Sequence, residues 1–374
     1  MLKGVHLTLM IGPAVPLPVP RVVLDALTSV EVTARSQGAS VFQLQFTLST
    51  HSPLQTIFLL SGGSSIPLVR VLIVVTVNGT PEVLMDGVMT NHEVSPGSDA
   101  GHATLTVTGE DLSRVMDYID FRIPYPAMPR EVRVLLILAK YAMFGIVPLV
   151  IPSPLLDIPL PTGRIPAQHA TDLKYLQHLA DDVGYVFYVD PGPAPGISTA
   201  YWGPMIKVGA PQKALNVDMG PLTNVEPLTF SYNSDAKKLP GLLIQEETTK
   251  ALIGIPLPDI TPLNPPLGLI RPFPKGFEWV MGVGKVSPLQ AALIGIAKSI
   301  KNDGAVTAKG SLDVLRYGGT LKPRRLVAAR GVGTAFDGLY FVNSVTSTLK
   351  RGEFKQSFEL SRSGLVSSLP KVPA

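Results

Sequence analysis

Residues 171–189 read TDLKYLQHLADDVGYVFYV, and the rest of the chain is interpreted outward from this stretch. A helix advances about 100° per residue, and on that period the apolar residues gather within an arc of about 120°. These residues are Leu173, Leu176, Leu179, Ala180 and Val183. Thr171 or Asp172 can cap the start, and Gly184 can close the end in the left-handed conformation. We therefore predict a helix over residues 172–183, followed by an aromatic strand over residues 185–189.

Two acidic residues, Asp181 and Asp182, fall in the last turn of this predicted helix. The helix dipole disfavours negative charge at that end. We expect these carboxylates either to be solvated or to pair with the cations of a partner.

The composition bounds the possible classes of protein. The chain has 374 residues, of which 45% are hydrophobic and only 16% are charged, so we expect two or three domains and apolar faces that partner chains cover. The net charge of +4 is small, and no block of like charges indicates a nucleic-acid surface. The absence of cysteine excludes disulfides and thiolate chemistry, which fits a protein made in a reducing cytoplasm.

Membrane insertion and secretion signals are not expected. Four prolines interrupt the apolar N-terminus, at positions 13, 16, 18 and 20, and make it a poor signal peptide. The longest apolar run, residues 132–151, contains Arg133, Lys140, Gly145 and Pro148. A transmembrane helix with these residues is improbable.

Residues 1–120 are predicted to form a mostly antiparallel β domain, expected to be a barrel. Period-two alternation indicates strands over residues 30–35, 42–48 and 103–108, and Asn78-Gly79 predicts a hairpin after an apolar strand at 69–77. Gln43 and Gln45 suit a face that meets a polar lumen or another subunit. Residues 109–116, starting at Gly109, are expected to turn into a short helix.

The remaining chain divides into three further predicted regions. Residues 121–215 form an α/β insertion that contains a helix near 131–144 as well as the helix 172–183. Residues 216–304 supply linker strands, a proline-rich arm and a helix at 288–301, which starts at Ser287-Pro288. Residues 305–374 form a second barrel, completed by strands from 216–250, whose last hairpin turns at Arg351-Gly352. The predicted fold class is α+β, mainly β.

The proline-rich arm, residues 255–274, is predicted to lie outside both barrels and to contact another chain. Proline cannot donate to an internal ladder, so this apolar segment does not suit a sheet interior. Its candidate interface residues are Ile255, Leu257, Ile260, Leu263, Leu267 and Phe273.

No catalytic, cofactor-binding or metal-binding residues are expected. The six histidines have no metal-ligand spacing, residues 282–285 lack the glycine and hydroxyl positions of a phosphate loop, and no nucleophile elbow occurs. The densest basic cluster consists of Lys322, Arg324, Arg325 and Arg330. This cluster is either a solvated face or a contact that lines a tube or meets an acidic subunit.

Three segments resemble the baseplate hub proteins of contractile phage tails and injection systems, of the late control D type. They are the helix, Gly184 and aromatic strand of residues 171–189, the segment TVTGEDLSRVMD at residues 106–117, and the region from the predicted helix 288–301 to the last hairpin. The third segment also resembles the hub part of valine-glycine repeat spike proteins, although the histidine that many members carry after this V-x-x-V strand is replaced here by Thr346 and Ser347.

The resemblance implies two tube-like barrels and a non-enzymatic role. A homotrimeric ring would join a separate trimeric spike to the inner tube protein and to other baseplate components, because three chains with two barrels each match a sixfold tube. Such a chain is made in the bacterial cytoplasm and becomes part of a phage tail or injection particle. Two alternatives stay open: a tail-associated cell-wall hydrolase, which needs an acid pair in a cleft, and a receptor- or carbohydrate-binding tail module, which needs exposed aromatics.

Overall fold

The computed structural model describes residues 4–48, 54, 58, 68–96, 103–154, 165–245, 252–256, 262–280, 294–295 and 304–369. Most described residues are in β-strands, and antiparallel pairing predominates. The mainly β, α+β class predicted from the sequence is therefore confirmed. No helix within these ranges is long and apolar enough to span a membrane.

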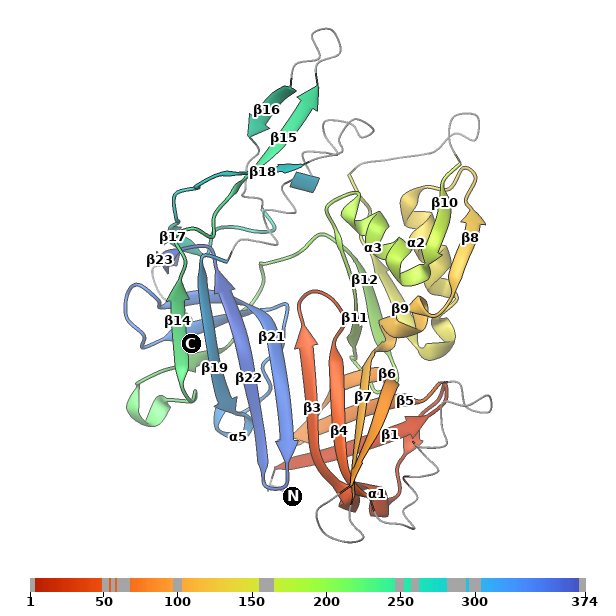
Figure 1. Ribbon diagram of the computed structural model, residues 1–374. Helices are drawn as coiled ribbons and strands as arrows, with labels where there is room; N and C mark the ends of the chain where they lie inside the picture. Colours follow the sequence, from red (N-terminus) through yellow and green to blue (C-terminus); the bar gives the residue numbers. More distant parts are fainter. Residues whose placement is uncertain are drawn as a thin grey trace.

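The centre of the molecule is a 13-stranded sheet, in which strands from both ends of the chain lie side by side (Figure 1). Its main path runs β14-β19-β22-β21-β3-β4-β7-β6-β5-β1-β2; off this path, β20 pairs with β21, and β13 pairs with β20. The N-terminal strands are β1 Val5–Gly12, β2 Leu17–Pro18, β3 Leu27–Arg35, β4 Val41–Leu48, β5 Arg70–Val77, β6 Thr80–Pro96 and β7 Ala103–Asp111. The later strands are β13 Gln212–Asn216, β14 Leu228–Tyr232, β19 Val306–Asp313, β20 Leu326–Arg330, β21 Gly338–Lys350 and β22 Glu353–Arg362.

Strands β21 and β3 join the N-terminal and C-terminal β units through antiparallel pairing from Ser344 opposite Arg35 to Lys350 opposite Ser29. The two predicted hairpins are confirmed. Asn78 and Gly79 both have positive φ between β5 and β6, and Gly352 has a φ of 85° between β21 and β22. Each turn uses a residue that tolerates the left-handed region.

The main core lies on one side of this sheet. Alternate residues of β4 and β22 point into it, among them Phe42, Leu44, Phe46, Phe354 and Phe358. Strand β5 is buried on both faces except at Thr76, as its continuous apolar sequence predicted. The first short helix, α1 (Arg21–Ala26), adds Val23 to the same core.

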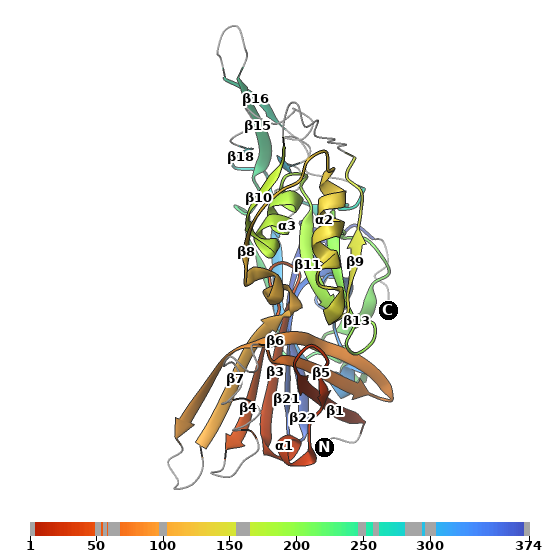
Figure 2. The same cartoon turned by 90° about the vertical axis from the view of Figure 1, so that its right-hand side faces the viewer.

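The α/β insertion stands on the sheet as a separate group of elements with its own core (Figure 2). It contains the 3-10 helices η2 (Leu112–Asp117) and η3 (Ala142–Phe144), and the α-helices α2 (Arg130–Ala139) and α3 (Asp172–Asp181). Its strands are β8 Asp120–Pro124, β9 Ile146–Val150, β10 Ala167–Thr171, β11 Val186–Pro191 and β12 Ser198–Gly203. Strand β9 is an outer strand of the three-stranded sheet β11-β12-β9.

The helix and the aromatic strand predicted over residues 172–189 are present in the structure as α3 and β11. The Thr171 side chain accepts a hydrogen bond from the Lys174 amide at the start of α3, and Gly184 has a φ of 70° beyond its end. Leu176, Leu179, Ala180 and Val183 are buried, and the aromatic strand follows as β11.

The structure differs in detail from the sequence at Gly109 and in the proline-rich arm. Gly109 does not begin a turn, because β7 continues to Asp111, and the ring of Phe42 lies against the glycine. Strands form in and next to the predicted arm. Strands β16 (Leu252–Pro256) and β18 (Phe277–Val280) both pair with β15 (Leu239–Gln245). Strand β17 (Gly268–Ile270) pairs with β23 (Leu365–Ser367). The predicted helix 288–301 lies outside the described residues, apart from helical residues 294–295.

Candidate functional site

The side of the central sheet opposite its core is polar across both β units. Two rows of directly paired residues, one from β19 to β6 and the other from β22 to β6, contain no apolar side chain. One row is Asp313, Lys355, Thr348, Glu31, Gln43, Thr108 and Asn91, and the next is Glu353, Lys350, Ser29, Gln45, Thr106 and Glu93. We call these two rows the polar face.

Contacts among side chains on this side of the sheet hold neighbouring strands together. The Thr33 and Thr346 hydroxyls lie 2.9 Å apart across the β3–β21 junction, and the Ser29 hydroxyl donates to the Gln45 side chain at 3.0 Å. Lys355 pairs with Glu353 and with Glu226, and these hydrogen bonds raise the pKa of Lys355. The surface is thus hydrophilic and mixed in charge, and it suits contact with water or a polar macromolecule.

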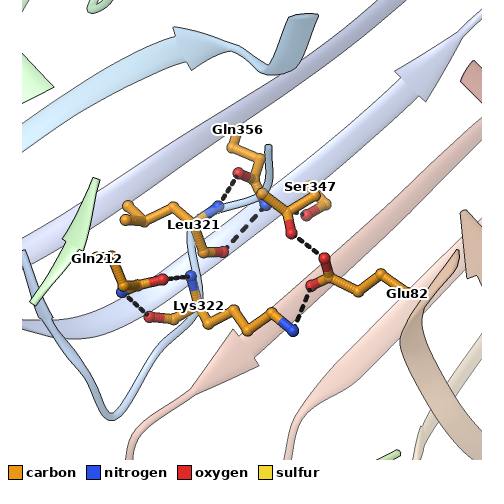
Figure 3. A network of polar contacts seen from close by, with 7 residues as sticks. Glu82, Gln212, Leu321, Lys322, Ser347 and Gln356 are labelled. Carbon is orange, nitrogen blue, oxygen red and sulfur yellow. Dashed lines mark hydrogen bonds and ion pairs between the residues drawn. The ribbon is translucent and has the colours of Figure 1, made fainter. Parts of the chain in front are cut away.

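A second polar group lies where the two β units meet, around residues 320–322 (Figure 3). The Gln356 side chain accepts from the Leu321 amide at 2.7 Å and donates to the Leu321 carbonyl at 3.2 Å. The Gln212 side chain accepts from the Lys322 amide and donates to the Lys322 carbonyl, each at 2.9 Å. Glu82 of β6 accepts from the Thr320 hydroxyl and pairs with the Lys322 ammonium at 3.2 Å. These contacts fix the loop of the C-terminal unit against the N-terminal unit.

Two side chains of the predicted basic cluster, Lys322 and Arg324, pair with acidic residues of the same chain. The Arg324 guanidinium is 3.8 Å from the ring centre of Tyr188, pairs with Asp190 at 2.8 Å and donates to the Ser36 carbonyl at 3.3 Å. Its side chain is only 11% exposed, so Arg324 is not part of a solvated face, and a contact of this cluster with another subunit stays a prediction. Burial raises the pKa of Tyr188, although the charge of Arg324 opposes this shift.

The other members of the cluster occupy different places. Arg325 lines a cavity of about 300 Å3 between the β units and the insertion, together with Lys322, Glu82 and Asp190. Arg330 ends β20, and its carbonyl accepts from the Val217 amide. The structure therefore disperses residues that are close in the sequence.

A buried ion pair ties the first β unit to the insertion. The Arg70 guanidinium binds both carboxylate oxygens of Asp86 at 2.7 Å, and both side chains are almost fully buried. Arg70 also donates to the Gly196 carbonyl, and the Ser198 hydroxyl donates to Asp86 at 3.2 Å. Asp111 ends β7 and is paired with Gly87, the residue after Asp86. It accepts hydrogen bonds from the Ser40 and Ser113 amides, yet burial raises the pKa of its carboxyl group.

The predicted arm residues divide into three groups. Leu267 is only 7% exposed and packs in a small core with Leu326 and Phe341, because β17 pairs with β23 of the same chain. Leu267 is thus largely buried within its own chain, and its predicted contact with another chain stays a prediction. Leu263 and Phe273 are exposed, Phe273 at 83%. Ile255 lies in β16, and Leu257 and Ile260 lie outside the described residues.

An exposed apolar surface on the insertion was missed in the sequence. It lies on the outer side of α2 and consists of Val132, Leu135 and Leu136; Met143 of η3 is also exposed, as are Val147 and Leu149 on the face of β9 that points away from the insertion core. We call it the insertion patch. The signal was present in α2, whose sequence REVRVLLILA has leucine and valine on both sides, and a surface helix normally has one polar side.

Among the described residues, no group of three acidic or histidine side chains could hold a metal ion. The charged groups at the junction are instead engaged in pairs and hydrogen bonds that position one β unit against another.

No protein-family model matches the sequence, and no curated protein matches it. Solved structures do match the fold. A tail protein from Neisseria meningitidis MC58 aligns over 97% of this chain and 98% of its own, with a TM-score of 0.62 and 14% identity. The E. coli c3393 protein, described as a type VI secretion component similar to the T4 tail proteins gp27 and gp5, aligns over 93% and 76%, with a TM-score of 0.52 and 12% identity.

A chain from the Francisella PdpA–VgrG complex aligns over 100% of this chain and 55% of its own, with a TM-score of 0.59 and 10% identity. These matches extend over almost the whole chain, including the two β units and the insertion. The chain therefore has the fold of phage tail proteins and type VI secretion components, as the three sequence segments predicted.

Proposed function

We propose that this chain is the structural baseplate hub of a contractile tail or injection system. Three copies form a ring that joins a separate trimeric spike to the sixfold inner tube, and other baseplate components surround the ring. The polar face lines the central channel of this ring.

The polar face is the observation that carries this proposal. It is continuous from β19 to β6 and passes through the β3–β21 junction, so both β units of one chain contribute to one hydrophilic wall. A ring of three such chains presents six β units around its axis, which is the symmetry that a sixfold tube requires. The glutamines and threonines of β4 and β7 are polar and carry no charge, so this part of the wall suits the passage of cargo of either sign.

The similarity to the tail proteins and to the chain of a complex that contains VgrG supports the same role. It also supports a spike protein as partner and an assembled tail or injection particle as the location. In this role the chain works through its surfaces and is not an enzyme.

The proposal predicts the stoichiometry of the complex. Native mass spectrometry of the full chain, co-expressed with the spike and tube proteins of the same particle, should give a complex with three copies of this chain and three of the spike. A chain that stays monomeric in the presence of both partners would contradict the proposed hub.

A further inference from the structure

The insertion is firmly attached to the N-terminal β unit. Its elements pack on β6 and β7, and Val88 of β6 belongs to the insertion core. The buried pair of Arg70 and Asp86 reinforces this attachment, because it binds the Gly196 carbonyl and the Ser198 hydroxyl of the insertion. Figure 2 shows the insertion standing on β6.

The attachment to the C-terminal β unit is of a different kind and runs through Arg324, in the loop before β20. Its guanidinium lies over the Tyr188 ring and pairs with Asp190, and both partners belong to β11 of the insertion. The same group donates to the Ser36 carbonyl between β3 and β4 of the N-terminal unit. One side chain thus contacts all three parts of the molecule.

Arg324 is held in this place under local strain. Its φ is 63°, in the left-handed region that residues with a side chain seldom adopt, and its amide is fixed by the Val342 carbonyl at 3.0 Å. Its Nη2 atom is buried without a hydrogen-bond partner among the described residues. Backbone strain of this kind is concentrated at functional sites and switch regions. Opening of the contact would give Nη2 access to water.

The space beside Arg324 is not closely packed. The cavity of about 300 Å3 between the insertion and the β units is lined by Asp190 and Pro191 on the insertion side and by Glu82, Arg325 and Ser347 on the other. Protein cores contain few voids larger than a water molecule. A polar interface between parts of one chain, without a continuous apolar core, favours relative motion of those parts.

We propose that Arg324 is a clasp that holds the insertion against the C-terminal β unit, and that the insertion swings about its attachment on β6 when the clasp opens. This is a hinge motion, in which one rigid group of elements turns on another. The firm side of the hinge is the buried attachment at Asp86 and Val88, and the releasable side is the half-exposed pair of Arg324 and Asp190. The device belongs to the single chain and does not depend on the proposed ring.

Distances between paired spin labels test this motion, and the natural chain has no cysteine that would interfere with labelling. The first label pair, Gln177→Cys on α3 and Thr307→Cys on β19, spans the insertion and the C-terminal unit. The second pair, Thr47→Cys on β4 and Thr307→Cys, spans the two β units of the common sheet. All three positions are exposed. Double electron–electron resonance on the full chain measures the distribution of each distance.

Arg324→Ala is the test substitution, and Arg325→Ala is its matched control. Arg325 has the same charge at the next position, and its exposed side chain makes no hydrogen bond or ion pair with the described part of the chain. With Arg324→Ala, the first pair should show a second distance, shifted by about 5 Å or more, in about half of the molecules. Asp190→Asn should act in the same direction, whereas Arg325→Ala should retain the single distance of the natural chain.

The second label pair separates release of the insertion from damage to the fold, and its distance should stay the same in every variant. If Arg324→Ala leaves the first pair at its natural distance, Arg324 is only a contact of the fold and the proposed clasp is wrong. If the second pair broadens as well, the sheet itself has loosened, which also contradicts the clasp. Equal shifts with Arg324→Ala and Arg325→Ala would mean that the lost charge, and not this contact, moves the insertion, and would again overturn the proposal.

Discussion

Gln356 shows at the scale of a single residue how the two β units are held together. It is only 1% exposed and satisfies the amide and carbonyl of Leu321 as well as the Ser347 hydroxyl, to which it donates at 2.9 Å. A leucine of similar size would leave these buried groups without partners, and each unsatisfied group costs about 1–3 kcal/mol.

We therefore expect Gln356→Leu to lower the free energy of unfolding by about 2–4 kcal/mol. Urea unfolding followed by tryptophan fluorescence measures this change. Ser357→Ala, at the exposed neighbouring position of the same strand, is the control and should change the value by less than about 0.5 kcal/mol. Equal effects of the two substitutions would show that the Gln356 contacts do not stabilise the fold.

Only part of this residue-scale arrangement could be predicted from the sequence. Alternation along β22 places Gln356 on the same side as Phe354 and Phe358. It could not identify Gln212 and Glu82 as partners of the loop at Lys322, because both are brought there by chain segments more than 100 residues away. The partner of Arg324 could not be identified for the same reason, because the ring that covers this side chain belongs to β11.

Gly109 sets the packing of strand β7 against its neighbours. It pairs with Phe42 of β4 on one side and with Met89 of β6 on the other. A methyl group at this position would collide with the Val88 carbonyl oxygen and with the ring of Phe42. Backbone and buried ring cannot both move away without disturbing the core.

Gly109→Ala should therefore lower the free energy of unfolding by about 2 kcal/mol or more. Gly304→Ala is a matched control, since its methyl group would lie 3.6 Å from the nearest atom, the Ser361 Cβ, in ordinary contact. The control should be neutral or slightly stabilising, because alanine restricts the unfolded chain. Thermal unfolding by circular dichroism compares the two, and a Gly109→Ala variant as stable as the control would refute the packing described here.

The elements themselves were mostly predictable, and the exceptions have physical causes. Local signals are strong for α3, with its cap and closing glycine, and for the hairpins at Gly79 and Gly352. The side on which α2 is buried was not predictable, because leucine and valine lie on both sides of that helix and its two arginines, Arg130 and Arg133, are buried. The pairing of β17 was missed because proline next to a strand argues against a sheet, yet a three-residue strand at an edge avoids the missing donors.

At the scale of the whole molecule, the most consequential feature is the continuity of the sheet. The two predicted β units share it through β3 and β21, whose paired residues are more than 300 positions apart in the sequence. No local pattern encodes such a pairing. It turns two regions that the sequence presents as separate into one wall with a core side and a polar face.

The position of this wall in an assembled particle is the most direct test of the proposed function. Cryo-electron microscopy of the tail or injection particle should resolve three copies of the chain between spike and tube. Six β units should surround the axis, with Gln43, Thr106 and Thr348 of the polar face directed into the channel. A map in which the chain lies away from the axis, or in which this polar face points outward from the ring, would contradict the account.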